Sequence, residues 1–462
     1  MTTLALLNEP RCLDLGSFAL MPPRPIPEPG TKSHRGWDAL NVAHGTARFR
    51  DEAARECLDT VAVLRSYRQP LPGEVWTLPL GAERRMLAQV NAILALGRPA
   101  LERVAELGID ADLPDPGRAF ASLFVLGCAA GPAWREPMLA LFVAAVRRNP
   151  AEGAAAIEAM SLAPNTEVLD GVSRLLASEH PKLRAAAVRV LAFRAALSPQ
   201  QWVAATLDDD ESVALAAACA PVAGIDRERC RAALERLLHH RSEGLVRAAL
   251  RAGLGLRLEA AHRRAGEIAR SNPGWADALQ CLAMFGRRSD EDTIRAVMAG
   301  PQWLSGVRAA ALAGRVGLVP DLLLLSPPDD AAPAQREEIP RALSVITGLP
   351  FGAVENRATA DRLWARHRDR FVPRHRYRHG QFFHPAVLLR SLKLDAAEQV
   401  DPRWHLRESR QQAYLELVSA TEGRVPRFSA YDFVARQRVG LQRIDAWLIE
   451  LIDAGWVAGP LL

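Results

Sequence analysis

The chain has 462 residues, 49% of them apolar and 24% charged, and a formal net charge of +5 at pH 7. This length allows two or more domains or one long repeat array, and no run is long and apolar enough to span a bilayer. Alanine, leucine, valine and arginine dominate, whereas the alternation typical of strands is nearly absent. The composition therefore favours an all-α fold.

The six cysteines are scattered and form no CxxC pair, so we interpret them as small buried side chains in a reducing compartment. The N-terminus lacks a basic region, and Glu9, Arg11 and Asp14 interrupt its apolar residues, unlike a signal peptide. We therefore expect a cytoplasmic protein. Lysine occurs at only three positions, which the coding bias of GC-rich DNA explains more simply than arginine-specific chemistry.

The first fifty residues look irregular. The stretch "PPRPIPEPG", from Pro22 to Gly30, is incompatible with a helix because its prolines lack amide donors and restrict the residues before them. We predict a Pro-rich N-terminal strap over residues 1–50.

The strongest signal is a repeat in which a polar, Gly or Pro turn is followed by an anchor at the fourth position. The anchors, separated by 30, 33, 30 and 31 residues, are Leu183, Val213, Val246, Ala276 and Val307. Three residues further on stand Ala186, Ala216, Ala249, Leu279 and Ala310. Such a period fits two short helices and two turns, which bury their apolar faces only by stacking on neighbours. We therefore predict a HEAT-like α-solenoid of helical hairpins over residues 51–325.

An arginine follows the anchor in three repeats, at Arg184, Arg247 and Arg308, and we expect it to bond to the turn of the neighbouring repeat. The stretch "SPPDDAAPAQREEIP", from Ser326 to Pro340, then breaks the pattern and predicts a linker over residues 326–350. A C-terminal helical module should follow over residues 351–462. Its helices are expected over residues 356–371, 385–392, 407–423 and 429–454.

Motifs that carry chemistry are missing: the sequence has no phosphate-binding glycine loop, no GxSxG and no HExxH. The acids of "LDDDES", from Leu207 to Ser212, fit a repeat turn ahead of a helix better than a calcium loop. His375 and His379 are four residues apart, but Pro373, Gly380 and the surrounding arginines oppose a metal site. We expect no catalytic residue, no metal and no cofactor.

Basic residues concentrate in one region. Residues 351–410 contain thirteen Lys or Arg and seven Asp or Glu, a surplus of six positive charges, so the rest of the chain sums to about −1. The centre is "RHRDRFVPRHRYRHGQFFHP", from Arg366 to Pro385. It fits a solvated loop, a nucleic-acid segment with interleaved aromatic residues, or a docking surface for an acidic protein.

We predict an exposed surface that binds a protein partner, with nucleic acid as the alternative. The predicted binding residues are Arg366, Arg368, Arg370, Arg374, Arg376 and Arg378. We expect Tyr377, Phe382 and Phe383 to anchor the segment and leave the arginines facing outward.

Residues 80–440 resemble a proteobacterial family of HEAT-repeat proteins that ends with a Trp-bearing helix, an Arg-Tyr-x-x-Gly segment, a further helix and a final Arg-Gln pair. The matching residues are Trp364, Arg376, Tyr377, Gly380, Arg410, Glu416, Gly423, Arg436 and Gln437. Genes of that family often lie among those for type VI secretion spike, adaptor and effector proteins.

The resemblance implies an accessory role in toxin loading or delivery, and it carries over no catalytic residue. We therefore expect a non-enzymatic scaffold that binds a secretion effector, adaptor or spike component, or blocks a toxin as an immunity protein. A HEAT-like nucleic-acid-binding or DNA-repair protein is the alternative. An enzyme such as a chromophore lyase with related repeats finds no supporting residues in the sequence.

Overall fold

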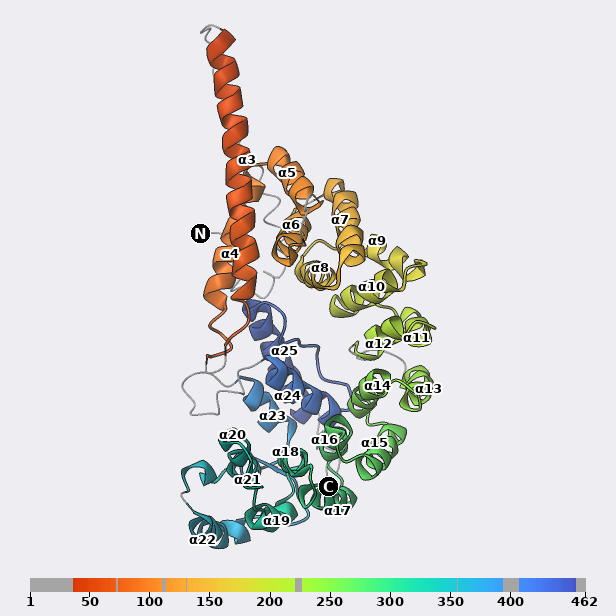
Figure 1. Cartoon of the computed structure of the whole chain (residues 1–462), viewed down its shortest axis with the longest axis vertical. Helices are drawn as coiled ribbons and strands as arrows, with labels where there is room; N and C mark the ends of the chain where they lie inside the picture. Colours follow the sequence, from red (N-terminus) through yellow and green to blue (C-terminus); the bar gives the residue numbers. More distant parts are fainter. Residues whose placement is uncertain are drawn as a thin grey trace. The chain divides into compact units, whose positions relative to one another are not determined.

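The computed structural model describes residues 36–71, 74–109, 114–129, 131–220, 227–354, 356–393 and 407–453. Within these ranges the regular structure is helical apart from two strands of two residues each, so the predicted all-α class is confirmed. Figure 1 follows the helices along the chain by colour. No helix in the described ranges has both the length and the apolar character needed to cross a membrane.

The chain divides into two compact units that interleave in sequence. Among the described residues, unit 1 holds those up to Ala220, Arg407–Ser409 and Ser429–Gly440. Unit 2 holds the described residues from Arg227 to Lys393, Arg410–Phe428 and Leu441–Asp453. The boundary thus falls inside the predicted repeat region, and the predicted C-terminal module contributes to both units.

The helices of unit 1 are α3 (Gly36–Ser66), α4 (Leu80–Ala95), α5 (Arg98–Ile109), α6 (Pro116–Cys128), η1 (Pro132–Trp134), α7 (Arg135–Arg148), α8 (Pro150–Leu162), α9 (Leu169–Arg174), η2 (Leu175–Ala177), α10 (Pro181–Phe193), α11 (Pro199–Thr206) and α12 (Glu211–Ala218). Helices α6, α8, α10 and α12 pack on one another in chain order. Each also packs on the helix before it, which is α5, α7, α9 or α11. Helix α3 packs on α4, α5 and α6.

Unit 2 repeats this plan. Its helices are α13 (Arg227–Leu238), α14 (Glu243–Gly255), α15 (Glu259–Ser271), α16 (Ala276–Phe285), η3 (Arg288–Asp290), α17 (Glu291–Met298), α18 (Trp303–Ala313), η4 (Val316–Leu318), α19 (Val319–Leu324), α20 (Pro333–Arg336), α21 (Glu338–Thr347), η5 (Phe351–Ala353), α22 (Arg357–His367), η6 (Arg368–Arg370) and α23 (Pro385–Lys393). Helices α14, α16, α18 and α21 pack in sequence, each against a preceding partner. Helices α24 (Arg407–Ala420) and α25 (Val434–Asp453) contain residues of both units.

Local signals explain where several of these helices start. Proline stands at the first position of α6, α8 and α11, where its missing amide hydrogen is not needed. The residue before each proline caps the helix through its side chain: Asp115, Asn149 and Ser198. In α11, Gln201 completes a reciprocal capping box.

The repeat positions lie on the mutually packed helices. Four anchors, Leu183, Val213, Val246 and Val307, are buried, whereas Ala276 is only partly buried because it is the first residue of α16. All five positions three residues later are buried: Ala186, Ala216, Ala249, Leu279 and Ala310. These small or compact side chains allow the successive helices to pack closely.

The arginines after the anchors bond across repeats, as predicted. Arg184 pairs with Asp208 at 2.8 Å, Arg247 with Asp277 at 2.8 Å, and Arg308 with Glu338 at 3.2 Å. Each acid lies in the turn before the next packed helix or in that helix's first turn. At that end of a helix, a carboxylate also interacts favourably with the helix dipole.

Two predicted boundaries are wrong. Residues 338–347, placed in the linker, form α21, which packs on α18 through buried side chains such as Leu343 and Ile346. Only the Pro-rich part before α21 departs from the repeat pattern. Residues 36–50, placed in the N-terminal strap, belong to α3, because no proline occurs between Pro29 and Ser66. The proline run itself lies outside the described residues.

Candidate functional site

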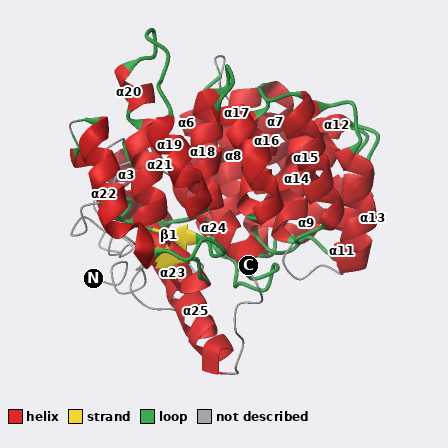
Figure 2. Cartoon of the chain, turned by 90° about the horizontal axis from the view of Figure 1, so that it is seen from below, coloured by secondary structure: helices red, strands yellow, loops and turns green. Residues whose placement is uncertain are grey.

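The predicted binding segment contains a small β-hairpin. Strands β1 (Tyr377–Arg378) and β2 (Gln381–Phe382) pair antiparallel, with Tyr377 opposite Phe382. His379 and Gly380 connect them with φ angles of 51° and 75°, the left-handed conformation that a two-residue hairpin turn requires. We call residues 375–383 the capping hairpin and residues 366–374 the basic arm. The hairpin packs on α21 through β1 (Figure 2).

The capping hairpin lies on the C-terminal ends of successive helices. The last carbonyl groups of a helix have no intrahelical donor, so they need partners from elsewhere. Backbone amides of the hairpin supply them: Tyr377 N donates to Gly314 O at 2.7 Å, His379 N to Val345 O at 2.6 Å, and Gly380 N to Ile346 O at 3.1 Å. The hairpin therefore joins the ends of α18 and α21.

Arg376 extends this capping to α16. Its guanidinium group donates to the carbonyl oxygens of Ala313 at 2.9 Å, Leu312 at 3.1 Å and Met284 at 3.4 Å. The group also lies 3.8 Å from the ring centroid of Phe383. A planar cation with several donors suits helix C-termini because their carbonyl groups carry partial negative charge.

Two further buried arginines complete the arrangement. Arg315, which follows α18, is fully buried and donates to the carbonyl oxygens of Gly286 and Arg374. Arg378 forms a buried ion pair with Glu416 of α24. Removing one partner of such a pair leaves a buried charge without compensation, which costs about 3–5 kcal/mol.

Burial shifts the pKa values of these groups. Loss of hydration, together with the neighbouring Arg378, lowers the pKa of Arg376 to about 9, so the guanidinium still carries its charge at neutral pH. Burial raises the pKa of Glu416, and the two arginines beside it oppose that rise. The site is thus a cluster of buried arginines. Carbonyl groups at helix ends and the Glu416 carboxylate compensate its positive charge.

The prediction that all six arginines face outward is wrong for two of them. The relative exposures of Arg376 and Arg378 are only 3% and 2%. Arg376 is buried because it caps a helix end, and Arg378 because it pairs with Glu416. The other four, all in the basic arm, are exposed: Arg366, Arg368, Arg370 and Arg374. The segment therefore has a structural half and a solvent-facing half.

The aromatic residues divide in the same way. Tyr377 and Phe383 are buried, but Phe382, predicted as an anchor, keeps 56% of its exposure because β2 lies on the outer side of the hairpin. His375 lies edge-on against Phe382, with the ring centroids 5.0 Å apart. Nowhere in the described ranges do three His, Cys, Asp or Glu side chains gather in a way that would hold a metal ion.

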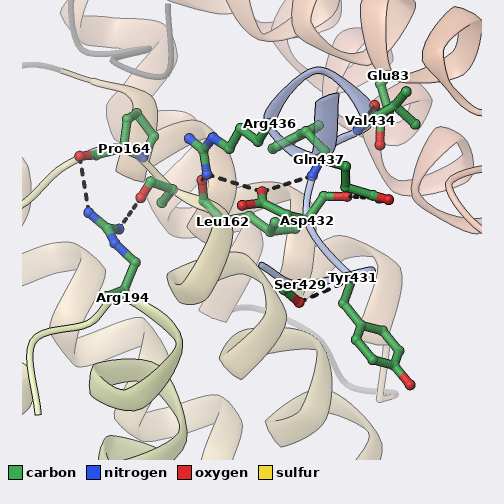
Figure 3. Close-up of polar contacts among 12 residues, drawn as sticks. Glu83, Leu162, Pro164, Arg194, Ser429, Tyr431, Asp432, Val434, Arg436 and Gln437 are labelled. Atoms are coloured by element: carbon green, nitrogen blue, oxygen red, sulfur yellow. Dashed lines mark hydrogen bonds and ion pairs between the residues drawn. The ribbon is translucent and has the colours of Figure 1, made fainter. Parts of the chain in front are cut away.

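Unit 1 contains a similar arrangement in residues 429–437 (Figure 3). Arg436 donates to Leu162 O at 3.1 Å and Arg194 to Pro164 O at 3.2 Å, both at the C-terminal end of α8. Burial and the nearby Arg436 lower the pKa of Arg194 to about 10. The first amide of α25, from Val434, donates to the Glu83 carboxylate at 2.8 Å. In each unit, a C-terminal segment thus donates to carbonyl groups at helix ends: residues 429–437 to the end of α8 in unit 1, and the capping hairpin to the ends of α16, α18 and α21 in unit 2.

Several of these residues had a signal in the sequence. Arg376 is one of the predicted binding residues, whereas Glu416, Arg436 and Gln437 are indicated only by the family resemblance. The contacts of all four are structural. Arg315 and Arg194 were missed. The sequence feature that marks this region is a glycine just after the last turn of several packed helices. Gly286, Gly314 and Gly348 adopt the left-handed conformation there.

A scan of protein-family models and a search of curated proteins found no match to the chain. Among solved structures, E. coli YibA is 14% identical with a TM-score of 0.32, and the match covers 57% of this chain and 87% of YibA. An engineered protein is 14% identical with a TM-score of 0.31, over 87% and 98%. Human deoxyhypusine hydroxylase in complex with glycerol is 15% identical with a TM-score of 0.19, over 66% and 98%. At these TM-scores the likenesses support no statement about fold or function.

We predict that Gly314→Ala destabilises unit 2 by about 2–4 kcal/mol, because a left-handed φ and a collision act together. Gly314 has a φ of 64°, and a Cβ there would collide with the Tyr377 carbonyl oxygen. Gly97→Ala is the matched control: its φ is 81°, but a Cβ there meets no atom within 4 Å, so about 1 kcal/mol is expected. Urea unfolding measures both, and equal losses would show that the hairpin does not press on the helix end.

We also predict acid sensitivity from His379. Burial, with Arg378 and Arg390 nearby, lowers its pKa from 6.5 to about 4 in the folded chain. Between pH 6.5 and pH 4 the unfolded chain binds a proton at His379 that the folded chain does not bind. The free energy of unfolding therefore falls as the pH is lowered from 7, by on the order of 3 kcal/mol.

His379→Asn keeps a residue that tolerates the left-handed turn but does not titrate. Unfolding free energies measured from pH 7 to pH 4 should fall less steeply in this variant. Some sensitivity should remain, because burial also lowers the pKa of His384. An unchanged pH profile would contradict the assignment to His379.

Proposed function

We propose that the protein is a non-enzymatic, protein-binding scaffold: a HEAT-like α-solenoid with a binding surface in its C-terminal part. The packing of every second helix in each unit supports the solenoid, as does the repeat period of the sequence. Cys57, Cys128 and Cys281 form no disulfide, which fits the reducing bacterial cytoplasm.

One observation carries the binding proposal. The capping hairpin uses Arg376 and Arg378 for structure, while Arg366, Arg368, Arg370 and Arg374 of the adjoining arm stay exposed. Guanidinium groups this close in sequence repel one another, so they contribute little to the stability of the isolated chain. An acidic protein surface would turn that repulsion into attraction and speed association at low salt.

The family resemblance supplies the kind of partner. We propose a type VI secretion effector, adaptor or spike component, with this chain acting as an accessory adaptor or chaperone. An immunity-type role, in which the chain blocks a toxin, uses the same surface and the same charge complementarity.

The alternative is a nucleic-acid-binding or DNA-repair protein. The observation that favours it is the exposed Phe382 in the hairpin that follows the exposed arginines of the arm, since bases stack on exposed aromatic rings and phosphates bind cations. Steep salt dependence of binding to mixed-sequence DNA would identify this function.

We predict that the triple variant Arg368→Glu, Arg370→Glu, Arg374→Glu keeps its unfolding midpoint but loses partner capture by at least about tenfold. The residues are exposed, so the fold should tolerate them. Affinity purification of the tagged chain from native cells, with quantitative mass spectrometry, measures the loss of an acidic protein.

The control reverses three exposed arginines elsewhere in unit 2, at Arg241, Arg263 and Arg288, and so matches the change in net charge. Capture should survive in this variant. Equal loss in both variants would indicate a non-specific effect of net charge, and undiminished capture by the first variant would exclude the basic arm as the binding surface.

A further inference from the structure

Phe382 is an exposed aromatic residue with a fixed position. It lies in β2, opposite the buried Tyr377, and the two ring centroids are 5.1 Å apart. The His375 ring also contacts it edge-on, with the ring centroids 5.0 Å apart. These contacts hold the ring while 56% of the residue remains accessible.

The support beneath Phe382 reaches into the body of unit 2. The Tyr377 hydroxyl accepts a hydrogen bond from Val372 N at 2.7 Å, and the Tyr377 ring lies 5.0 Å from Phe371. Phe371 in turn lies 5.5 Å from Trp364 of α22. An exposed ring that is already immobilised loses little conformational freedom on binding, which favours its use as an anchor.

Cations and a second apolar side chain immediately precede this supporting pair in the chain. A tight turn, closed by His375 N donating to Val372 O at 3.0 Å, holds Val372 and Arg374 close to His375 along the backbone, and His375 contacts Phe382. Val372 and Arg374 are both exposed, and Arg368 and Arg370 precede the turn in η6. An apolar centre with a charged rim is the usual anatomy of a protein interface.

We infer that this surface recognises an acidic protein segment that carries an aromatic or large aliphatic side chain, with Phe382 as the contact for that side chain. The inference rests on the proposed protein-binding function and specifies its partner. Carboxylates of the segment pair with Arg368, Arg370 and Arg374, and the apolar side chain covers Phe382 and Val372.

The exposure of the aromatic residues favours a protein segment over nucleic acid. Single strands bind grooves in which successive bases stack on several rings. In the capping hairpin and basic arm, Phe371, Tyr377 and Phe383 are buried, which leaves Phe382 as the exposed Phe or Tyr ring of these two segments. One ring suits one anchoring side chain better than a run of bases.

Labelled peptides test the inference on the full chain by fluorescence anisotropy at low salt. The probes are a central tryptophan flanked by glutamates, the same peptide with alanine at the centre, and a single-stranded oligothymidylate. We expect the tryptophan peptide to bind about tenfold more tightly than the alanine peptide. Phe382→Ala should remove that difference and retain the weaker, charge-dependent binding.

Phe49→Ala, which removes a similarly exposed phenylalanine from α3, should leave the tenfold ratio intact. The triple charge reversal of the arm should abolish binding of both peptides. If both peptides bind equally and the charge reversal abolishes them, the aromatic anchor is wrong but the acidic partner stands. If neither peptide binds, the proposed function fails as well. Tighter binding of oligothymidylate, lost in Phe382→Ala, would replace the protein partner with nucleic acid.

Discussion

The structure of unit 2 depends on how the carbonyl groups at its helix ends find donors. Helices α16, α18 and α21 pack on one another in turn, and each leaves carbonyl groups at its C-terminal end that nothing within the helix satisfies. The capping hairpin crosses the ends of α18 and α21 and supplies amides from its own backbone. Arg376 and Arg315 supply guanidinium donors to the same row and reach α16. A segment that is distant in sequence thereby fixes three successive helices to one another.

This arrangement also explains the use of arginine at particular places. A lysine ammonium is a compact point charge, whereas the planar guanidinium of Arg376 reaches three carbonyl oxygens on two helices. Coding bias is the expectation from the sequence for the scarcity of lysine, but Arg376, Arg315 and Arg194 each donate to more than one carbonyl oxygen, a geometry that lysine does not reproduce. The buried positive charge is tolerated because helix C-termini and Glu416 compensate it.

Much of the fold follows from local patterns in the sequence. The spacing of Leu183, Val213, Val246 and Val307 predicts helices that pack on one another, and all four side chains are buried. Ala276 departs from the pattern because its helix starts at that residue. The acidic, Pro-containing segment that leads into α21 was wrongly predicted to be a linker, because its prolines and acids also suit the first turn of a helix.

The candidate site was predictable only in part. Exposure of Arg366, Arg368, Arg370 and Arg374 is what a charged loop normally shows. The burial of Arg376 and Arg378 depends on carbonyl groups more than sixty residues away and on Glu416, so no local pattern contains it. The positive-φ glycines after α16 and α18 are the sequence feature that marks the surface on which the hairpin lies.

Amide hydrogen exchange tests the central claim most directly, namely that the basic segment is divided into a capping half and a solvent-facing half. The amides of Tyr377, His379 and Gly380 donate to helix-end carbonyl groups, whereas Arg374 lies in the exposed arm. The account predicts that the three hairpin amides exchange only when unit 2 opens, while Arg374 exchanges at the rate of an unprotected amide. Equally fast exchange at all four positions would contradict it, because the hairpin would then not be bound to the helix ends.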